Sequence, residues 1–316
     1  MNHPDQVDFI PNDNINREKW DRCIDQAVNG NICNYSWFLD IMCPGWDALV
    51  MGDYDFIMPL PLKNKLGIRY LFQPLFIQQC GVFGRTTPSE EILNQFLKAI
   101  PQNISVIDYH FNEKNDLSFA KDVEKRPNLL LNLNKSYEEL KLNYTLNLSR
   151  NLRKSVHTGF HIIHTEDPSS IIDLFRKEKG GKFSAIKDQN YLKLTRVINA
   201  CLHRNKAKVW SVYNRHNELI AGVIWLFSHG RAVFYFSAQS KSGKQDHALT
   251  WLIDDFIHKN ASSGIILDFE GSINPGLARF YAGFGSLQTS YPRLKLNNVN
   301  PLMNTIYQAY RKINKR

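Results

Sequence analysis

The residues of this chain best suited to chemistry lie between positions 265 and 285. An apolar run, Ile265–Leu267, leads into two carboxylates, Asp268 and Glu270, and a glycine turn follows. Carboxylates two positions apart on a strand project to the same face, where one can act as general base toward an amine. Tyr281 follows on a predicted helix, and its hydroxyl can protonate a leaving group. The alternative is a solvated acid pair and a core tyrosine.

A basic helix supplies a second group of candidates. Arg150, Arg153 and Lys154 are spaced three and four positions apart, so on a helix they share one face. Such a face suits a pyrophosphate or a nucleic-acid backbone. The formal net charge of +9 favours polyanionic partners in the same way. A solvated helix face is the alternative interpretation, and the basic tail 311–316 is open to the same two interpretations.

The loop that follows a predicted strand over 231–237 is another candidate for phosphate binding. It carries Gln239, Lys241 and Lys244, and it precedes a helix predicted from Ala248. The N–H groups and the dipole of a helix N-terminus attract anions.

The remaining residues predict neither a metal site nor a nucleophile. There is no Walker-type loop and no Ser/His/Asp or Cys/His signature. His157, His161 and His164 are the nearest approach to a metal cluster. Gly159 separates the first from the others, and positions 161 and 164 of a strand point to opposite faces. No metal is therefore expected.

An internal repeat determines the predicted domain organisation. A helical apolar spacing over 89–101, followed by a strand over 104–111, recurs 160 positions later as a helix over 248–259 and a strand over 264–270. Asp108 and Asp268 are equivalent in this register, but position 110 is histidine where position 270 is glutamate. Only the second copy therefore has the carboxylate pair.

The repeat predicts two copies of a mixed α/β domain rather than one large sheet. The expected domains are residues 1–136 and 137–316, and the second carries the candidate active site. Its predicted elements include a basic helix over 137–156, a β-α-β crossover into the Asp268 strand, and a C-terminal helix over 301–313.

Composition predicts a cytoplasmic protein. The five cysteines are odd in number and include no CxxC pair, a pattern typical of buried free thiols in a reducing compartment. No apolar run approaches the roughly 20 residues that a membrane-spanning helix needs. The N-terminus has no signal-peptide features, so no integral membrane segment is expected.

Two segments of the chain resemble the FemAB-like acyltransferases. They are the stretch 267–285, which contains Asp268, Glu270 and Tyr281, and the basic stretch 149–155. The resemblance implies two GNAT-fold domains in one chain. It also implies transfer of an acyl or aminoacyl group from an activated carrier to an amine, such as that of a peptidoglycan precursor. The resemblance implies no cofactor, because acyl-CoA or aminoacyl-tRNA would be a co-substrate. If the donor is aminoacyl-tRNA, tRNA is also a partner.

The resemblance also implies roles for individual residues. Tyr281 falls where GNAT enzymes place the tyrosine that protonates the departing group, and Asp268 and Glu270 fall on the strand that borders the acceptor amine. The strand over 231–237 and the Asp268 strand would separate to admit the acyl carrier.

Two departures from the family pattern leave the donor open. The loop 239–247 does not fit the Arg/Gln-x-x-Gly-x-Gly/Ala pattern that binds the CoA pyrophosphate, and no heptad arm like that of the longer cell-wall enzymes is present. The alternative function is a non-catalytic GNAT-like protein with a basic surface that binds nucleic acid or phosphate.

Overall fold

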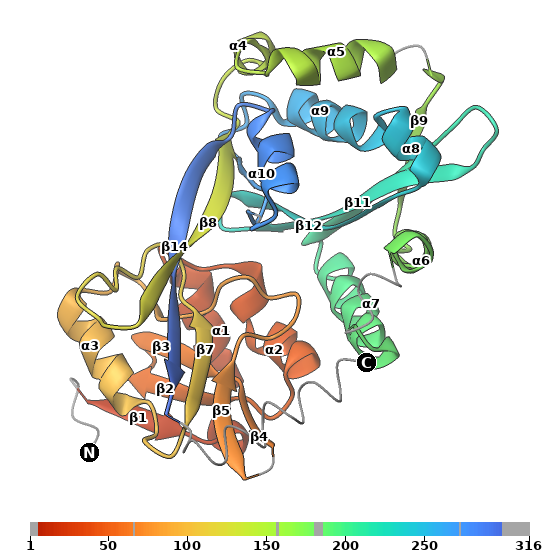
Figure 1. The fold of residues 1–316 in the computed structure, drawn as a ribbon. Coiled ribbons are helices and arrows are strands. Elements are labelled where there is room, and N and C mark those ends of the chain that lie inside the picture. The colour runs from red at the N-terminus through yellow and green to blue at the C-terminus, as the bar shows by residue number, and fades with distance from the viewer. Residues whose placement is uncertain (1–5, 66, 156–157, 180–185, 272, 299–316) are drawn as a thin grey trace. The chain divides into compact units, whose positions relative to one another are not determined.

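The computed structural model describes residues 6–298 except 66, 156–157, 180–185 and 272. The chain divides into two compact units, one comprising Met1–Arg126 with Ser290–Arg316 and the other Pro127–Thr289. Both contain helices and strands, which confirms the mixed α/β class (Figure 1). The predicted helix over 301–313 and the basic tail lie outside the described residues.

The described part of the first unit contains helices and strands from two sheets. Its helices are α1 (Arg17–Gln26), α2 (Ser36–Met42) and α3 (Glu90–Ala99). One sheet has the order β1 (Val7–Ile10), β2 (Asp47–Met51), β3 (Phe56–Leu60) and β6 (Phe83–Gly84), with antiparallel neighbours. In the other sheet β4 (Leu62–Lys65), β5 (Ile68–Phe72), β7 (Val106–His110) and β14 (Leu287–Asn297) are consecutive neighbours.

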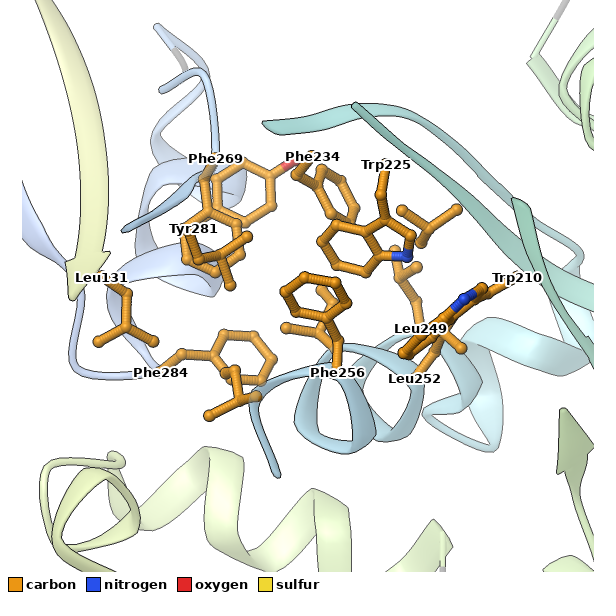
Figure 2. Close-up of a cluster of buried hydrophobic side chains, with 14 of the residues drawn as sticks. Leu131, Trp210, Trp225, Phe234, Leu249, Leu252, Phe256, Phe269, Tyr281 and Phe284 are labelled. Carbon is orange, nitrogen blue, oxygen red and sulfur yellow. The ribbon is translucent and has the colours of Figure 1, made fainter. Parts of the chain in front are cut away.

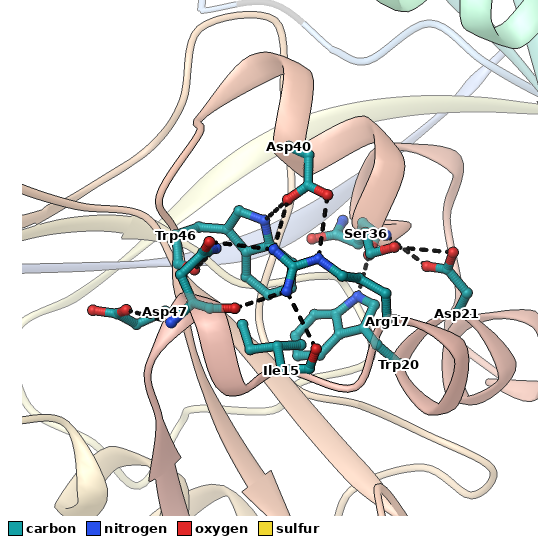
Figure 3. A network of polar contacts seen from close by, with 10 residues as sticks. Ile15, Arg17, Trp20, Asp21, Ser36, Asp40, Trp46 and Asp47 are labelled. Carbon is teal, nitrogen blue, oxygen red and sulfur yellow. Dashed lines mark hydrogen bonds and ion pairs between the residues drawn. The ribbon is translucent and has the colours of Figure 1, made fainter.

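A polar network joins α1 to α2 in the first unit (Figure 3). Arg17 donates to Asp40 at 3.2 Å, and the indole N–H of Trp46 donates to the same carboxylate at 2.8 Å. Asp21 on α1 accepts from the backbone N–H and the hydroxyl of Ser36, the first residue of α2. These charge-assisted bonds fix the helices over a core that contains no disulfide, since all five cysteines are free and buried.

The strands of the second unit belong to the ten-stranded sheet that also contains β4, β5, β7 and β14. In sheet order the strands of this unit are β8 (Val123–Asn132), β13 (Ile266–Asp268), β12 (Arg231–Gln239), β11 (Leu219–Ser228), β10 (Ala207–Tyr213) and β9 (His161–Thr165). Its helices are α4 (Tyr137–Leu142), α5 (Leu146–Ser155), α6 (Ser169–Lys179), α7 (Asp188–Leu202), α8 (Lys241–Gln245), α9 (Ala248–Asn260) and α10 (Pro275–Ala282). The β12–β13 pair is parallel and the other adjacent pairs are antiparallel. The predicted β-α-β crossover is therefore confirmed.

The core of the second unit lies between the sheet and α9 (Figure 2). Trp225 on β11 stacks on Phe256 of α9 with ring centroids 3.8 Å apart, and further aromatic rings from β12 and α10 continue the cluster. Burying each such side chain stabilises the fold by about 1.5–3 kcal/mol. Helix α5 packs on the outer side of α9, and α6 lies on the opposite face of the sheet (Figure 1).

The basic helix predicted over 137–156 is in fact two helices. The break falls at Asn143–Thr145, where the N–H of Thr145 donates to the carbonyl of Gly283 at 3.0 Å. A Cβ on Gly285 would lie 2.7 Å from the Cβ of Asn143, so a glycine permits this close approach. Contacts with the segment after α10 thus accompany the end of α4, and the Thr145 hydroxyl accepts from the N–H of Leu148 at 3.4 Å at the start of α5.

Candidate active site

The site is built where β12 and β13 separate. The two strands pair in parallel over only three positions, Arg231↔Ile266, Ala232↔Leu267 and Val233↔Asp268. Strand β12 then continues to Gln239 beside β11, and in the described part of the chain no strand pairs with its other edge after Val233. Substrates commonly bind where parallel strands separate beyond their carboxyl ends.

Asp268 is the last residue of β13, and its carboxylate is already engaged. It is 5% exposed. One oxygen accepts from Arg231 at 2.9 Å and the other from the N–H of Glu270 at 2.8 Å. Burial raises its pKa above the ordinary value although Arg231 opposes that shift. One oxygen thus fixes the turn that follows and the other joins β13 to the start of β12, which indicates a positioning role.

Glu270 lies in a turn rather than on the strand predicted over 264–270. The strand ends at Asp268, and both Glu270 (φ +54°) and Gly271 (φ +53°) have left-handed backbones. A Cβ on Gly271 would lie 2.2 Å from the carbonyl oxygen of Pro127, so position 271 needs glycine. A left-handed glutamate costs on the order of 1 kcal/mol. The turn, not strand alternation, therefore determines where the Glu270 carboxylate lies.

The surroundings of Glu270 suit a general base. Its pKa is raised well above the ordinary value, first by burial and then by the negative charge of Asp268. Among the described residues, no donor hydrogen-bonds to its carboxylate. A carboxylate with a raised pKa is a stronger proton acceptor once it is ionised.

Tyr281 projects from α10 into the aromatic cluster beside this turn (Figure 2). Its ring stacks on Phe269 at 4.9 Å and meets Phe234 edge-on at 5.7 Å. Burial, with the Glu270 charge as second cause, raises the pKa of its hydroxyl to about 12. The hydroxyl therefore stays protonated near neutral pH and is available as an acid.

The start of helix α10 is determined by its own N-terminal sequence. The side chain of Asn274 accepts from the N–H of Gly276 at 2.9 Å, and Pro275 occupies the first helical position. Both features are typical helix starts. They place Tyr281 near the end of a short, capped helix.

The predicted basic residues of α5 divide into two groups. Lys154 is close enough to His247, the residue before α9, that its charge contributes to lowering the pKa of His247, although burial is the larger cause. Arg150 and Arg153 are exposed on the outer side of α5. The structure therefore brings Lys154 toward the start of α9.

The predicted phosphate loop forms a compact turn at the end of β12. Gln239 is the last residue of that strand, and Lys241 and Lys244 lie exposed on α8. Ser240 caps α8 by accepting from the N–H of Gly243 at 3.0 Å. A Cβ on Gly243 would lie 2.2 Å from the carbonyl oxygen of Ile220, so glycine seats this helix against β11.

Comparisons with known proteins bear on the fold. No family model and no curated protein matches the chain. Among solved structures, FemX matches with a TM-score of 0.64 at 12% identity, over 93% of this chain and 98% of that chain. The chain has the fold of FemX. The predicted FemAB-like architecture is thereby confirmed.

The FemX fold is shared by two further matches. L-PGS from Bacillus licheniformis has a TM-score of 0.52 at 12% identity, over 88% of this chain and 92% of that chain. The C-terminal domain of a putative lysylphosphatidylglycerol synthetase from Agrobacterium fabrum has a TM-score of 0.53 at 10% identity, over 90% and 92%. At these identities the likeness concerns the fold alone.

In this FemX fold the histidines of β9 have aromatic partners. His161 stacks on Tyr213 at 5.7 Å, and His164 meets Trp210 edge-on at 4.8 Å, while His157 lies outside the described residues. Within the described part of the chain, no three His, Cys, Asp or Glu side chains group as metal ligands, and no helix is long and apolar enough to cross a membrane.

Sequence reasoning missed Arg231, which holds Asp268. Arg231 is the first residue of β12, and the parallel register places it beside the strand that ends at Asp268. The sequence did contain a signal for this contact. The predicted β-α-β crossover makes the strand over 231–237 a parallel neighbour of the strand that contains Asp268, so Arg231 at its start could have been recognised as a candidate partner.

Proposed function

We propose that the protein is an N-acyltransferase that transfers an acyl or aminoacyl group from an activated carrier to an amine acceptor. The observation that carries the proposal is the juxtaposition of Glu270, with a raised pKa, and Tyr281, with a pKa of about 12, where β12 and β13 separate. A base and an acid in electrostatic contact are what acyl transfer to an amine requires. The FemX fold and the sequence resemblance support the same reaction class.

Each group has one role in the proposed reaction. The acceptor nitrogen attacks the carbonyl carbon of the carrier ester or thioester, and Glu270 takes the proton that the nitrogen loses. The C–N bond forms, and the C–O or C–S bond to the carrier breaks. Tyr281 gives its proton to the departing oxygen or sulfur. The proton held by Glu270 then returns to the Tyr281 phenolate, which restores both groups.

Backbone groups would stabilise the intermediate in this proposal. The pairing of β12 with β13 ends at Val233, and in this proposal backbone N–H groups of β12 beyond that position donate to the carbonyl oxygen of the substrate. Donors aimed at a developing oxyanion lower the barrier by several kcal/mol. In this proposal Asp268 is a positioning residue. Its carboxylate accepts a hydrogen bond from the Glu270 N–H and so fixes the turn that holds Glu270.

The carrier and the acceptor are proposed by chemical class. The loop with Gln239, Lys241 and Lys244, together with Lys154, would bind the phosphates of a carrier at the start of α9. This role suits either acyl-CoA or aminoacyl-tRNA. The sequence resemblance favours the amine of a peptidoglycan precursor as acceptor.

The test is to incubate the purified protein with a panel of acyl-CoA thioesters and with aminoacylated tRNA, each in the presence of amine acceptors. Mass spectrometry of the small molecules and thiol or free-tRNA release identify the consumed carrier. We expect consumption of one carrier class by the wild type and strongly reduced consumption by Glu270→Gln. Tyr213→Phe, on β10, is the matched tyrosine control. Absence of any turnover with either class would favour the binding-protein alternative.

A further inference from the structure

Three leucines of the second unit are strongly exposed. Leu142 ends α4 with 84% exposure, Leu146 begins α5 with 83%, and Leu287 is 74% exposed. Leu142 and Leu146 flank the joint Asn143–Thr145, which hydrogen-bonds to Gly283 and packs against Gly285. Leu287 follows Gly285 by two positions. Single exposed leucines need no explanation, but the two that flank this joint, Leu142 and Leu146, indicate a contact surface.

The same side of α5 is basic. Leu146, Arg150 and Arg153 are spaced four and three positions apart and therefore share a face. The opposite face carries Leu148 and Leu152, which are 3% and 7% exposed. Neither arginine forms an ion pair with any described residue. We call Leu142, Leu146, Arg150 and Arg153 the α4–α5 outer face.

Helix α4 and the joint that follows it are anchored to α9. The hydroxyls of Tyr137 and Tyr144 donate to the two carboxylate oxygens of Asp254 on α9, both at 2.9 Å. The two acids of α4, Glu138 and Glu139, lie in its first turn, where Glu139 completes a capping box with Ser136. From Lys141 to Thr165 the sequence contains no acid, so the outer face of α5 is uniformly positive.

We infer that the α4–α5 outer face binds the surface of an anionic lipid bilayer. The leucines would enter the boundary between headgroups and acyl chains, while the arginines would meet lipid phosphates. This combination favours a bilayer over RNA, because RNA phosphates would satisfy the arginines and leave the leucines in water. The inference goes beyond the proposed acyl transfer and does not depend on it.

The experiment is cosedimentation of the full chain with vesicles of phosphatidylcholine alone and of phosphatidylcholine mixed with phosphatidylglycerol. We expect binding to the mixed vesicles that weakens with added salt, since charge attraction to the surface is screened. The double variant Leu142→Ser/Leu146→Ser should bind on the order of tenfold more weakly. Arg150→Gln/Arg153→Gln should lose at least as much and should lose most of the salt dependence.

Helix α7 offers a matched control. Leu192, which is 59% exposed, and Arg196 are spaced four apart like Leu146 and Arg150. Leu192→Ser/Arg196→Gln should bind the mixed vesicles as the wild type does. Equal weakening of this control and the α5 variants would overturn the inference, as would absence of binding to mixed vesicles. Binding of tRNA that needs the arginines but not the leucines, without vesicle binding, would assign the face to RNA instead.

Discussion

The two units contain the same crossover with different acids at its end. In the first, β5 and β7 pair in parallel over three positions that end at Asp108; in the second, β12 and β13 do so over three positions that end at Asp268. Helix α3 or α9 makes each connection. An antiparallel strand then completes each arrangement on the far side, β14 beside β7 and β8 beside β13.

The environments of the two aspartates differ. The side chain of Asp108 is 46% exposed, and Arg293 donates to both its oxygens at 2.6 and 2.7 Å. Burial opposes ionisation of Asp108, but the bonds and charge of Arg293 outweigh it and lower the pKa. For Asp268 burial prevails over a single bond from Arg231, and the pKa is raised.

The residue two positions further on differs as well. His110 is held by a contact of its Nδ1 with the carbonyl of Gln78 at 3.0 Å, whereas Glu270 has a raised pKa and a left-handed backbone. In the first unit Asp108 and His110 both have hydrogen-bonding partners. In the second unit the turn at Glu270 combines a buried carboxylate with a left-handed backbone. That combination is typical of functional sites.

The largest expected effect is on catalysis by Glu270→Gln. Removal of the general base should lower kcat of acyl transfer by about 10²–10⁴-fold. The equivalent change in the first unit, His110→Gln, should leave kcat within about twofold of wild type, because that residue faces no proposed substrate. Steady-state assays with the carrier that the incubation experiment identifies measure both. Similar losses in the two variants would remove the functional distinction between the copies.

The pH profile sharpens this prediction. In the wild type, kcat/KM should fall as the pH drops through the raised pKa of Glu270, which lies above the ordinary value of 4.5. The acid limb should disappear in Glu270→Gln and persist in His110→Gln. An unchanged acid limb in Glu270→Gln would assign the base to another group.

The next effect is on stability, through the two aspartates. Asp268→Asn should lower the free energy of unfolding by about 1.5–3 kcal/mol, because it removes the charged, buried acceptor of the hydrogen bond from Arg231. Asp108→Asn should cost only about 1 kcal/mol, since solvent screens that half-exposed pair. Urea denaturation followed by tryptophan fluorescence measures both. Equal costs would show that burial does not distinguish the two ion pairs.

A smaller effect is expected when either of two buried tyrosines, Tyr281 or Tyr109, is replaced by phenylalanine. Tyr281→Phe should reduce kcat by up to about 10²-fold with little change in stability, because no described residue hydrogen-bonds to its hydroxyl. The Tyr109 hydroxyl in the first unit donates to Pro59 at 2.7 Å and accepts from Gly81 at 3.1 Å. Tyr109→Phe should therefore cost about 1–3 kcal/mol of stability and leave kcat unchanged. A stability loss confined to Tyr281→Phe would reverse these assignments.

The crossovers could be predicted from sequence because their signals are local. The apolar spacing of α3 and α9, and the 160-residue offset between Asp108 and Asp268, lie within short windows. The compact units do not follow the predicted ranges 1–136 and 137–316, because β14 pairs with β7 from beyond the second unit. Pairing between residues about 185 positions apart, as for Arg293 with Asp108, leaves no trace in local periodicity.

The site residues show the same limit. Their types and order identified Asp268, Glu270 and Tyr281 as candidates, but strand alternation placed both acids on one face. The actual turn depends on the approach of Gly271 to Pro127 and on the ion pair with Arg231. Both contacts join segments distant in sequence, so the distinct environments of the two carboxylates could not be derived from their spacing.

The smallest expected effect is the pH dependence of stability, which should have opposite sign in the two copies. Because the folded state raises the pKa of Glu270, its contribution is present at low pH and is lost as the pH rises from 4.5 through the raised value. Because the folded state lowers the pKa of Asp108, its contribution is present above 3.8 and is lost as the pH falls below that value. Urea midpoints measured across pH should therefore flatten above 4.5 in Glu270→Gln and below 3.8 in Asp108→Asn. Curves parallel to that of the wild type in both variants would mean that neither carboxylate has a different pKa in the folded and unfolded chain.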